Sequence, residues 1–206
     1  LEPRLLKQEQ DSVKPCVRKC AAEHRGKMKP DKVSVYDLFD RQRQYVVPLY
    51  QRQYVWNRDT QWEPLWDDIV EKARQVQRGD ARAPHFLGAI VTSQQQVFGK
   101  QINSWDIIDG QQRLTTLQVV LTAFKDVVTA VEEPGYEVDL RRLTRNEGVM
   151  GAQTEIFKVW PTNADQMAFR RVMEAGALPA LAQAYPGLQR KKSKGVPRLV
   201  EAYRFF

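Results

Sequence analysis

The sequence contains few cysteines and no long apolar run. Its 206 residues include two cysteines, Cys16 and Cys20, too few for a disulfide framework, so a reducing cytoplasm is the expected location. No apolar run approaches the roughly 18 residues that span a membrane, and the first residues do not resemble a secretion signal. Internal repeats are also absent. These absences exclude disulfide-rich secreted proteins, membrane proteins and repeat proteins.

The common signatures of nucleotide and metal sites are missing as well. The sequence has no G-x-x-x-x-G-K-[ST] and no G-x-G-x-x-G, which excludes a P-loop and a dinucleotide-binding fingerprint. His24 follows Cys16 and Cys20 at a spacing of four, which is a weak case for zinc. His85 precedes an apolar run, where a position at a strand edge is favoured over metal ligation. We therefore predict no cysteine–histidine metal site.

The composition that is present belongs to a basic globular protein. Apolar residues make up 42% and charged residues 28%, and 32 lysines and arginines against 25 acids give a net charge of +7. A basic balance favours an anionic partner, and nucleic acid is the commonest one. The chain starts at Leu1 and stops within the pattern LVEAYRFF, so we expect it to be part of a longer protein.

Periodicity and turn residues predict an α+β arrangement. Helices are expected at 34–39, 60–76, 111–131 and 162–176, and strands at 85–93, 104–109 and 155–160. Thr60 and Glu63 are spaced as a capping box for the second helix. Residues 132–151, which contain Pro134 and Gly135, are interpreted as a loop. The two strands at 85–93 and 104–109 are predicted to be buried neighbours in one sheet.

The stretch WDIIDGQQRLTTLQVV, residues 105–120, joins a predicted strand to the strongest predicted helix. Gly110 allows a sharp turn and the close approach of another group. The N–H groups that open the helix attract anions, and Arg113 adds a planar fork suited to phosphate. Position and chemistry therefore indicate a phosphate site.

The other side chains of this junction fit the same interpretation. Gln111 and Gln112 can donate and accept, so they can hold phosphate oxygens, a base edge or an attacking water. Asp109 can bind Mg²⁺ or orient a water. The alternative is a plain Asp-Gly turn, with the arginine paired to an acid and the glutamines facing water. The residues alone leave both interpretations open.

A second cluster, VPLYQRQYVWN at 47–57, interleaves aromatic residues with amides and an arginine. Such a mixture suits stacking on bases and contact with phosphates. In a strand, Tyr50, Arg52, Tyr54 and Trp56 would share one face, although Pro48 restricts the segment to a sheet edge or a loop. The alternative is that the aromatic residues belong to the core.

In order and spacing, VPLYQRQYVWN, LWDDIV, HFLGAIV, IIDGQQRLTTL and KVWPTNADQMAF resemble the N-terminal domain of the GmrSD family of type IV, modification-dependent restriction proteins. The resemblance covers roughly residues 33–175 and leaves 1–32 as a basic N-terminal arm and 176–206 as the start of a helical region that continues beyond the chain. It implies a fold like that of ParB and sulfiredoxin, a mixed sheet flanked by helices, with a helical C-terminal extension.

The resemblance also implies an activity: NTP hydrolysis, with GTP or ATP as substrate and Mg²⁺ as cofactor, coupled to the sensing of modified double-stranded DNA. The phosphorothioate-sensing branch is one candidate. The implied catalytic residues are Asp109, Gln111, Gln112 and Arg113; the nucleotide-binding residues are Gly110, Arg113 and Thr115; the DNA-binding residues are Tyr50, Gln51, Arg52 and Trp56.

The resemblance further implies a C-terminal nuclease domain with an HNH-type histidine–metal site. Neither His24 nor His85 has such a setting, so we expect no nuclease activity in this chain. Two alternatives remain: a non-catalytic module whose DGQQR turn grips DNA phosphate, and a nuclease that uses Asp106 and Asp109 with a metal ion. The sequence leaves the nucleotide, the DNA modification and homo-oligomer formation open.

Overall fold

A computed structural model describes residues 30–80, 84–95, 102–148, 153–190 and 195–206. The chain divides into two compact units, Leu1–Val33 and Ser34–Phe206, and the second is described here. The predictions for Cys16, Cys20 and His24 lie outside the described residues.

A four-stranded sheet, ordered β2-β3-β1-β4, organises the second unit. Its strands are β1 (Arg43–Val46), β2 (Val91–Gln95), β3 (Asn103–Asp109) and β4 (Val159–Trp160). The central strand β1 pairs in parallel with β3 and with β4, whereas β2 pairs antiparallel with β3. The mixed sheet and its helices confirm the predicted α+β class.

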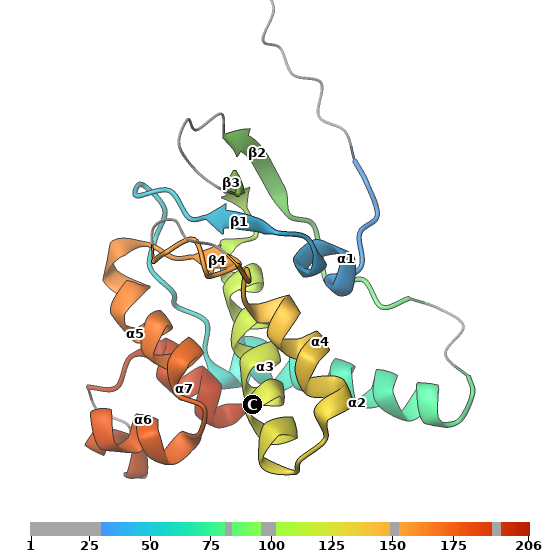
Figure 1. Ribbon diagram of the computed structural model, residues 1–206, viewed down its shortest axis with the longest axis vertical. Helices are drawn as coiled ribbons and strands as arrows, with labels where there is room; N and C mark the ends of the chain where they lie inside the picture. Colours follow the sequence, from blue (N-terminus) through green and yellow to red (C-terminus); the bar gives the residue numbers. More distant parts are fainter. Residues whose placement is uncertain (1–29, 81–83, 96–101, 149–152, 191–194) are drawn as a thin grey trace, which may run out of the picture. The chain divides into compact units, whose positions relative to one another are not determined.

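The helices gather mainly on one side of this sheet, which is the lower side in Figure 1. They are α1 (Val35–Asp40), α2 (Glu63–Gln77), α3 (Gln111–Ala130), α4 (Pro134–Thr144), α5 (Asn163–Glu174), α6 (Leu178–Ala184) and α7 (Arg198–Phe205), with a π-turn η1 (Arg58–Trp62) and a 3₁₀ turn η2 (Pro186–Gln189). In the part of the chain that the structure describes, no helix combines the length and the apolar character needed to cross a membrane.

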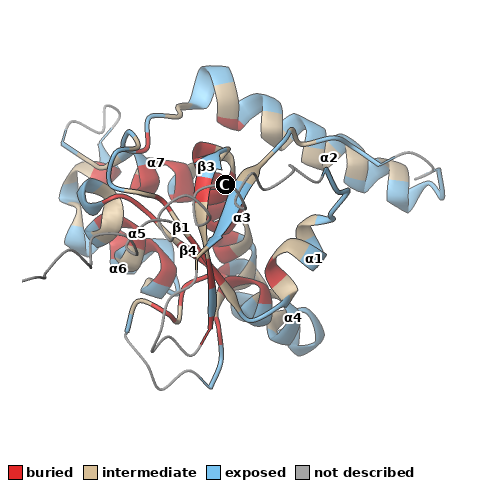
Figure 2. Cartoon of the chain, turned by 90° about the horizontal axis from the view of Figure 1, so that it is seen from above, coloured by how far each residue is buried: buried red, intermediate tan, exposed pale blue. Residues whose placement is uncertain are grey.

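Helix α3 is the centre of the core. Figure 2 shows buried residues along it and in the helices around it. Leu114 and Val119 of α3 are fully buried together with Ile107 of β3, Phe169 of α5 and Val200 of α7. The helices after residue 176 therefore contribute to the same hydrophobic core as the sheet.

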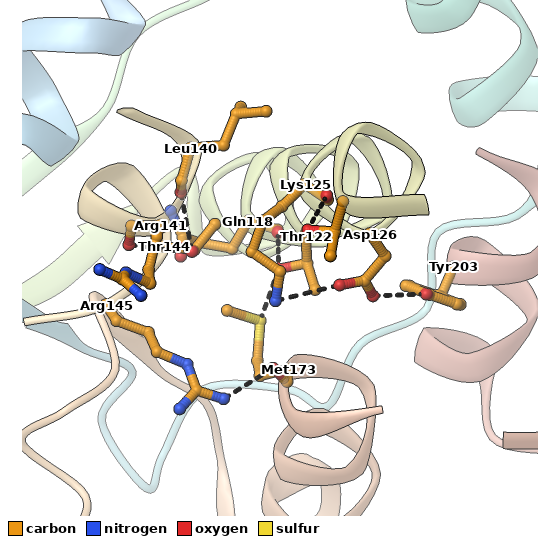
Figure 3. A network of polar contacts seen from close by, with 11 residues as sticks. Gln118, Thr122, Lys125, Asp126, Leu140, Arg141, Thr144, Arg145, Met173 and Tyr203 are labelled. Carbon is orange, nitrogen blue, oxygen red and sulfur yellow. Dashed lines mark hydrogen bonds and ion pairs between the residues drawn. The ribbon is translucent and has the colours of Figure 1, made fainter. Parts of the chain in front are cut away.

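Polar side chains also tie the neighbouring helices to α3 (Figure 3). Gln118 of α3 donates to the carbonyl oxygen of Leu143 on α4 at 3.1 Å. Tyr203 of α7 donates a 2.6 Å hydrogen bond to Asp126 of α3, and Thr122 contacts the sulfur of Met173 on α5. Because hydrogen bonds have direction, these contacts fix the rotation of each helix against α3 as well as its distance.

Two of the predicted strands are shorter than expected. The 85–93 segment was expected to be a buried strand, but β2 starts only at Val91 and its middle residues are exposed. The exposed residues are Thr92, Ser93 and Gln94, which are polar and need no cover from the core, at an edge of the sheet where β2 pairs only with β3 among the described strands. The 155–160 segment forms ladder pairs only at Val159 and Trp160, with an isolated bridge between Phe157 and Arg145.

The predicted loop at 132–151 is wrong, because it contains α4. Pro134 is the first residue of α4, where a missing N–H costs nothing and the fixed φ fits the helix. The apolar stripe of α3 is also only partly core: Phe124, Val127 and Val131 are exposed. These three residues lie in the second half of the helix and at its end, away from the sheet.

The predicted cap of the helix at 60–76 is wrong, whereas the expectation of a loop near Pro48 is confirmed. The helix cap at η1 is Asn57, whose Oδ1 accepts from the Thr60 N–H at 3.3 Å, and not the predicted Thr60–Glu63 box. Residues 50–56 form no strand, in agreement with the restriction of this segment by Pro48 to a sheet edge or a loop, so the face that its residues would share in a strand does not form. Tyr54 is 5% exposed and Tyr50 is 78% exposed, so the two side chains lie in different environments.

Candidate functional site

The DGQQR motif (Asp109–Arg113) lies where β3 ends and α3 begins. Since β1 and β3 are parallel, the residues after Val46 and the motif after β3 emerge at the same edge of the sheet. This edge, outside the carboxyl ends of parallel strands, is where open α/β sheets bind ligands. The strand topology alone therefore brings the DGQQR motif and the residues after Val46 to the same edge of the sheet.

Gly110 makes the turn that the sequence predicts. Its φ is +90°, in the left-handed region that favours glycine, and a Cβ here would lie 3.2 Å from the carbonyl oxygen of Ala89 and 3.1 Å from Cγ1 of Ile90. No side chain of the described residues caps α3 at Gly110. The N–H groups of the first turn of α3 therefore have no side-chain cap among the described residues, and uncapped N–H groups at a helix N-terminus can bind an anion.

Gln112 is bonded through both polar atoms of its side chain. Its Oε1 accepts from the Val55 N–H at 2.8 Å, and its Nε2 donates to the carbonyl oxygen of Gln53 at 3.0 Å. The amide thus pairs with the backbone on either side of Tyr54, as a neighbouring strand would. In this structure the side chain serves to hold the Arg52–Val55 segment against α3.

Gln111 holds the same segment one step earlier. Its Nε2 donates to the carbonyl oxygen of Arg52 at 3.1 Å, and the residue is only 8% exposed. Its Oε1 is buried and has no hydrogen-bond partner among the described residues. A buried acceptor without a partner is costly, so this oxygen is suited to a donor brought by a ligand or by water.

Arg113 contacts the loop on the other side of the motif. Its Nη1 donates to the carbonyl oxygen of Ala89 at 2.5 Å, and its guanidinium lies directly over Gly88. The side chain is half-buried, and it leaves further N–H groups for an anion. Glutamines on one side and the arginine on the other therefore connect α3 to both flanking loops.

The predicted DNA-binding residues occupy two different environments. Tyr50 and Arg52 are exposed, and Gln51 donates to the carbonyl oxygen of Ile108 at 3.0 Å. Trp56 is half-buried and packs against the hydrophobic core. The structure therefore brings Tyr50, Gln51 and Arg52 beside the motif and leaves Trp56 at the edge of the core.

The remaining predicted site residues differ in their exposure to solvent. Asp109 is exposed at the end of β3, whereas Thr115 is 3% exposed inside α3. Asp106 accepts from Gln95 at 2.5 Å. Among the described residues, no group of three acidic, histidine or cysteine residues is placed to hold a metal ion. Asp109 is thus the carboxylate that a ligand at the α3 N-terminus would meet.

Sequence reasoning missed Tyr54, which anchors the segment between the two motifs. Its hydroxyl shares a 2.6 Å hydrogen bond with Thr116 and accepts from Nε1 of Trp62 at 2.9 Å. Its backbone N–H donates to Asp165 at 2.7 Å. Burial raises the pKa of Tyr54 to about 12, so the phenol stays protonated well above the pH at which an exposed tyrosine ionises. For Tyr54 the alternative that the aromatic residues belong to the core is confirmed, although the spacing of the segment did not separate it from Tyr50.

A separate pocket of about 220 Å³ lies along α2, away from the motif. Its lining includes Asp68, Lys72 and His85, and Nε2 of His85 lies 3.3 Å from Oδ2 of Asp68. His85 thus lies before β2, with its ring facing Asp68 of α2.

A model of the family described as GmrSD restriction endonuclease, N-terminal domain, matches residues 35–206. The chain belongs to this family. A search among curated proteins found no match. Membership indicates a role in a restriction system, with DNA as the partner and a nuclease domain as part of the system.

Proposed function

We propose that this domain hydrolyses a nucleoside triphosphate and senses modified DNA, and thereby controls a nuclease. The observation that carries the proposal is the contact between Gln111 and the Arg52 backbone, which joins the exposed Tyr50–Arg52 segment to the N-terminus of α3. One face of this junction offers groups for phosphates, and the adjoining segment offers groups for DNA.

The nucleotide part uses the start of α3. Its uncapped N–H groups and the positive end of its dipole would receive phosphate oxygens. Arg113 lies in the same turn and would add charge-assisted hydrogen bonds from the N–H groups not bonded to Ala89. Asp109 fits Mg²⁺, which proteins commonly hold through one or two carboxylates together with substrate phosphates. When bound, the ion would neutralise charge on the phosphates.

Gln111 is the residue best suited to orient a water. Its Nε2 is fixed by Arg52, and its buried Oε1 has no partner among the described residues. A carbonyl oxygen held in this way would accept a hydrogen bond from an attacking water beside the phosphates. Gln112 has both side-chain groups bonded to Gln53 and Val55 and would act by holding the loop.

The DNA part uses the exposed loop after β1. Leu49 and Tyr50 are among the most exposed large apolar residues of the described chain, and Ile108 beside them is half-exposed. An exposed tyrosine can stack on a base, and Arg52 next to it can contact a phosphate. This surface is suited to a modified DNA backbone or base, including a phosphorothioate.

A second function has one observation in its favour. Both side-chain groups of Gln112 are bonded to the backbone of the Arg52–Val55 segment. This glutamine of the motif can therefore act in the fold alone, without contacting a nucleotide. The motif would then be a non-catalytic grip in which α3 and Arg113 hold a DNA phosphate. In that case nucleotide would not be consumed.

Phosphate release separates the two functions. The protein would be incubated with Mg²⁺ and either GTP or ATP, without DNA, with unmodified DNA and with phosphorothioate DNA. Release that rises with the modified DNA supports hydrolysis coupled to sensing. DNA binding without release from either nucleotide supports the non-catalytic grip.

A further inference from the structure

The Arg52–Val55 segment is held by side chains and not by a strand partner. Among the described residues, no backbone–backbone hydrogen bond involves these four residues. Its carbonyl groups at Arg52 and Gln53 accept from Gln111 and Gln112, and the Val55 N–H donates to Gln112. The position of the segment therefore depends on a few side chains.

One of these side chains lies outside both motifs. Oδ2 of Asp165, in the first turn of α5, accepts the backbone N–H of Tyr54 at 2.7 Å and the hydroxyl of Thr162 at 3.0 Å. A carboxylate forms stronger hydrogen bonds than a neutral acceptor and is favoured near a helix N-terminus. The α5 helix thus supplies the only side chain of the described residues that is bonded to the Tyr54 amide.

Tyr54 is consequently fixed at both ends. Asp165 of α5 holds its amide, while Thr116 of α3 and Trp62 of η1 hold its hydroxyl. The chain passes directly from Tyr50–Arg52 into this fixed residue. Displacement of Tyr54 would therefore move the exposed loop relative to Gly110 and Arg113.

We propose that Asp165 is a positioning residue, which holds the Tyr50–Arg52 loop in register with the DGQQR motif through the Tyr54 amide. This inference rests on the proposed function for its effect on DNA sensing, but not for its effect on the loop. Asp165 touches neither DNA nor nucleotide. It acts by keeping the two motifs in contact.

Amide hydrogen exchange tests the structural half directly. Asp165→Ala should speed exchange in the peptide that contains Tyr54 and Val55 by about tenfold or more, because one strong hydrogen bond is lost. Asp165→Asn keeps an acceptor oxygen and should restore most of the protection. Peptides of α3 should remain protected in both variants, which excludes general unfolding. Asp139→Ala, which removes an exposed helical carboxylate paired with Arg142, is the matched control.

DNA sensing tests the functional half. In Asp165→Ala the concentration of phosphorothioate DNA that gives half-maximal stimulation of phosphate release should rise about tenfold, with recovery in Asp165→Asn. Unchanged exchange in Asp165→Ala would overturn the inference, whatever the activity. Faster exchange with unchanged DNA response would also overturn it, because the loop would then need no positioning. Faster exchange in a protein whose wild type releases no phosphate would reject the proposed hydrolysis and leave the loop assignment intact.

Discussion

The side-chain Nε2 of Gln111 lies 3.1 Å from the carbonyl oxygen of Arg52, so two sequence clusters that are 59 positions apart meet at the start of α3. The resemblance to the GmrSD family implied one site for nucleotide and another for DNA. In the structure the residues of the two clusters are in direct contact. A substitution in one cluster should therefore affect the function of the other cluster.

Arg113→Ala should reduce NTP turnover by about 100-fold, the usual cost of losing a preorganised donor to a charged transition state. The fold should persist, because the side chain is half-buried and bonds only to the Ala89 carbonyl among the described residues. Circular dichroism and phosphate release would be measured on the same preparation. Full turnover in a folded variant would remove Arg113 from the catalytic role.

Gly88→Ala should have the same effect by displacing Arg113. A Cβ at Gly88 would lie 2.7 Å from Cζ of Arg113, and the φ of +101° adds strain. The double variant with Arg113→Ala should be no less active than Arg113→Ala alone, because both changes remove one interaction. Gly79→Ala is the matched control, with a φ of +74° and nothing within 4 Å. It should lower the free energy of unfolding by about 1–2 kcal/mol and leave turnover unchanged.

Gln112→Ala should weaken DNA binding as well as turnover. The change leaves the Gln53 carbonyl and the Val55 N–H without their partners, at a cost of about 1–3 kcal/mol each if they stay buried. Gln51→Ala removes one exposed hydrogen bond to Ile108 and should reduce DNA-stimulated turnover more than turnover without DNA. DNA affinity and phosphate release would be compared across both variants. Wild-type DNA affinity in a folded Gln112→Ala protein would contradict the inference that the two clusters depend on each other.

Lys158 should make the stability rise with pH above 8. The residue is 1% exposed, and burial lowers its pKa from 10.5 to about 8. Between these values the unfolded chain binds more protons than the folded one, so the free energy of unfolding increases with pH, by up to about 3 kcal/mol in total. Lys158→Met should abolish this rise, because it removes the amine, which donates to the carbonyl oxygen of Arg41 at 2.9 Å.

Urea denaturation between pH 7.5 and 9.5, a window of about two units chosen to lie below the ordinary tyrosine pKa of about 10, would measure the effect. Above that window Tyr54 acts with the opposite sign: because its pKa is raised to about 12, its contribution is full below pH 10 and is lost as the pH rises towards 12. Lys32→Met, at an exposed lysine, is the control. If the free energy of unfolding of Lys158→Met still rises with pH as in the wild type, the buried amine is not the cause of the rise.

DNA affinity should fall steeply between about 50 and 200 mM salt, because contacts to several phosphates release counterions. The net charge of +7 makes such contacts the expected main contribution to affinity. Titrations at several salt concentrations with modified and unmodified DNA would give both slopes. A DNA affinity that does not change with salt concentration would mean that the basic surface serves solubility and not DNA binding.

The sequence predicted the elements whose signals are local. Helix α3 was expected because its apolar spacing continues over five turns, and the Gly110 turn because only glycine adopts this conformation without strain. Helix α4 was missed because Pro134 and Gly135 were interpreted as a turn, although proline is favoured at the first helical position. The exposed side of α3 at Phe124 and Val127 was missed because periodicity does not say what covers a face.

The same division applies to the site. The residues of the DGQQR junction could be named from their chemistry, and the structure places them at one sheet edge. Their partners could not be named, since Gln112 bonds to Val55 and Tyr54 bonds to Asp165 across 57 and 111 positions. Such pairs follow from tertiary packing, which a local pattern does not encode.

The hydrogen bonds of Gln111 and Gln112 also affect how related sequences should be compared. A relative that had become a pseudoenzyme would still need both amides, because they hold the loop after β1. Asp109 is different: it is exposed, and its side chain has no hydrogen bond or ion pair among the described residues. A substitution at Asp109 would cost the fold little. Under the proposed hydrolysis, this position should therefore distinguish relatives that hydrolyse nucleotide from relatives that do not better than the two glutamines do.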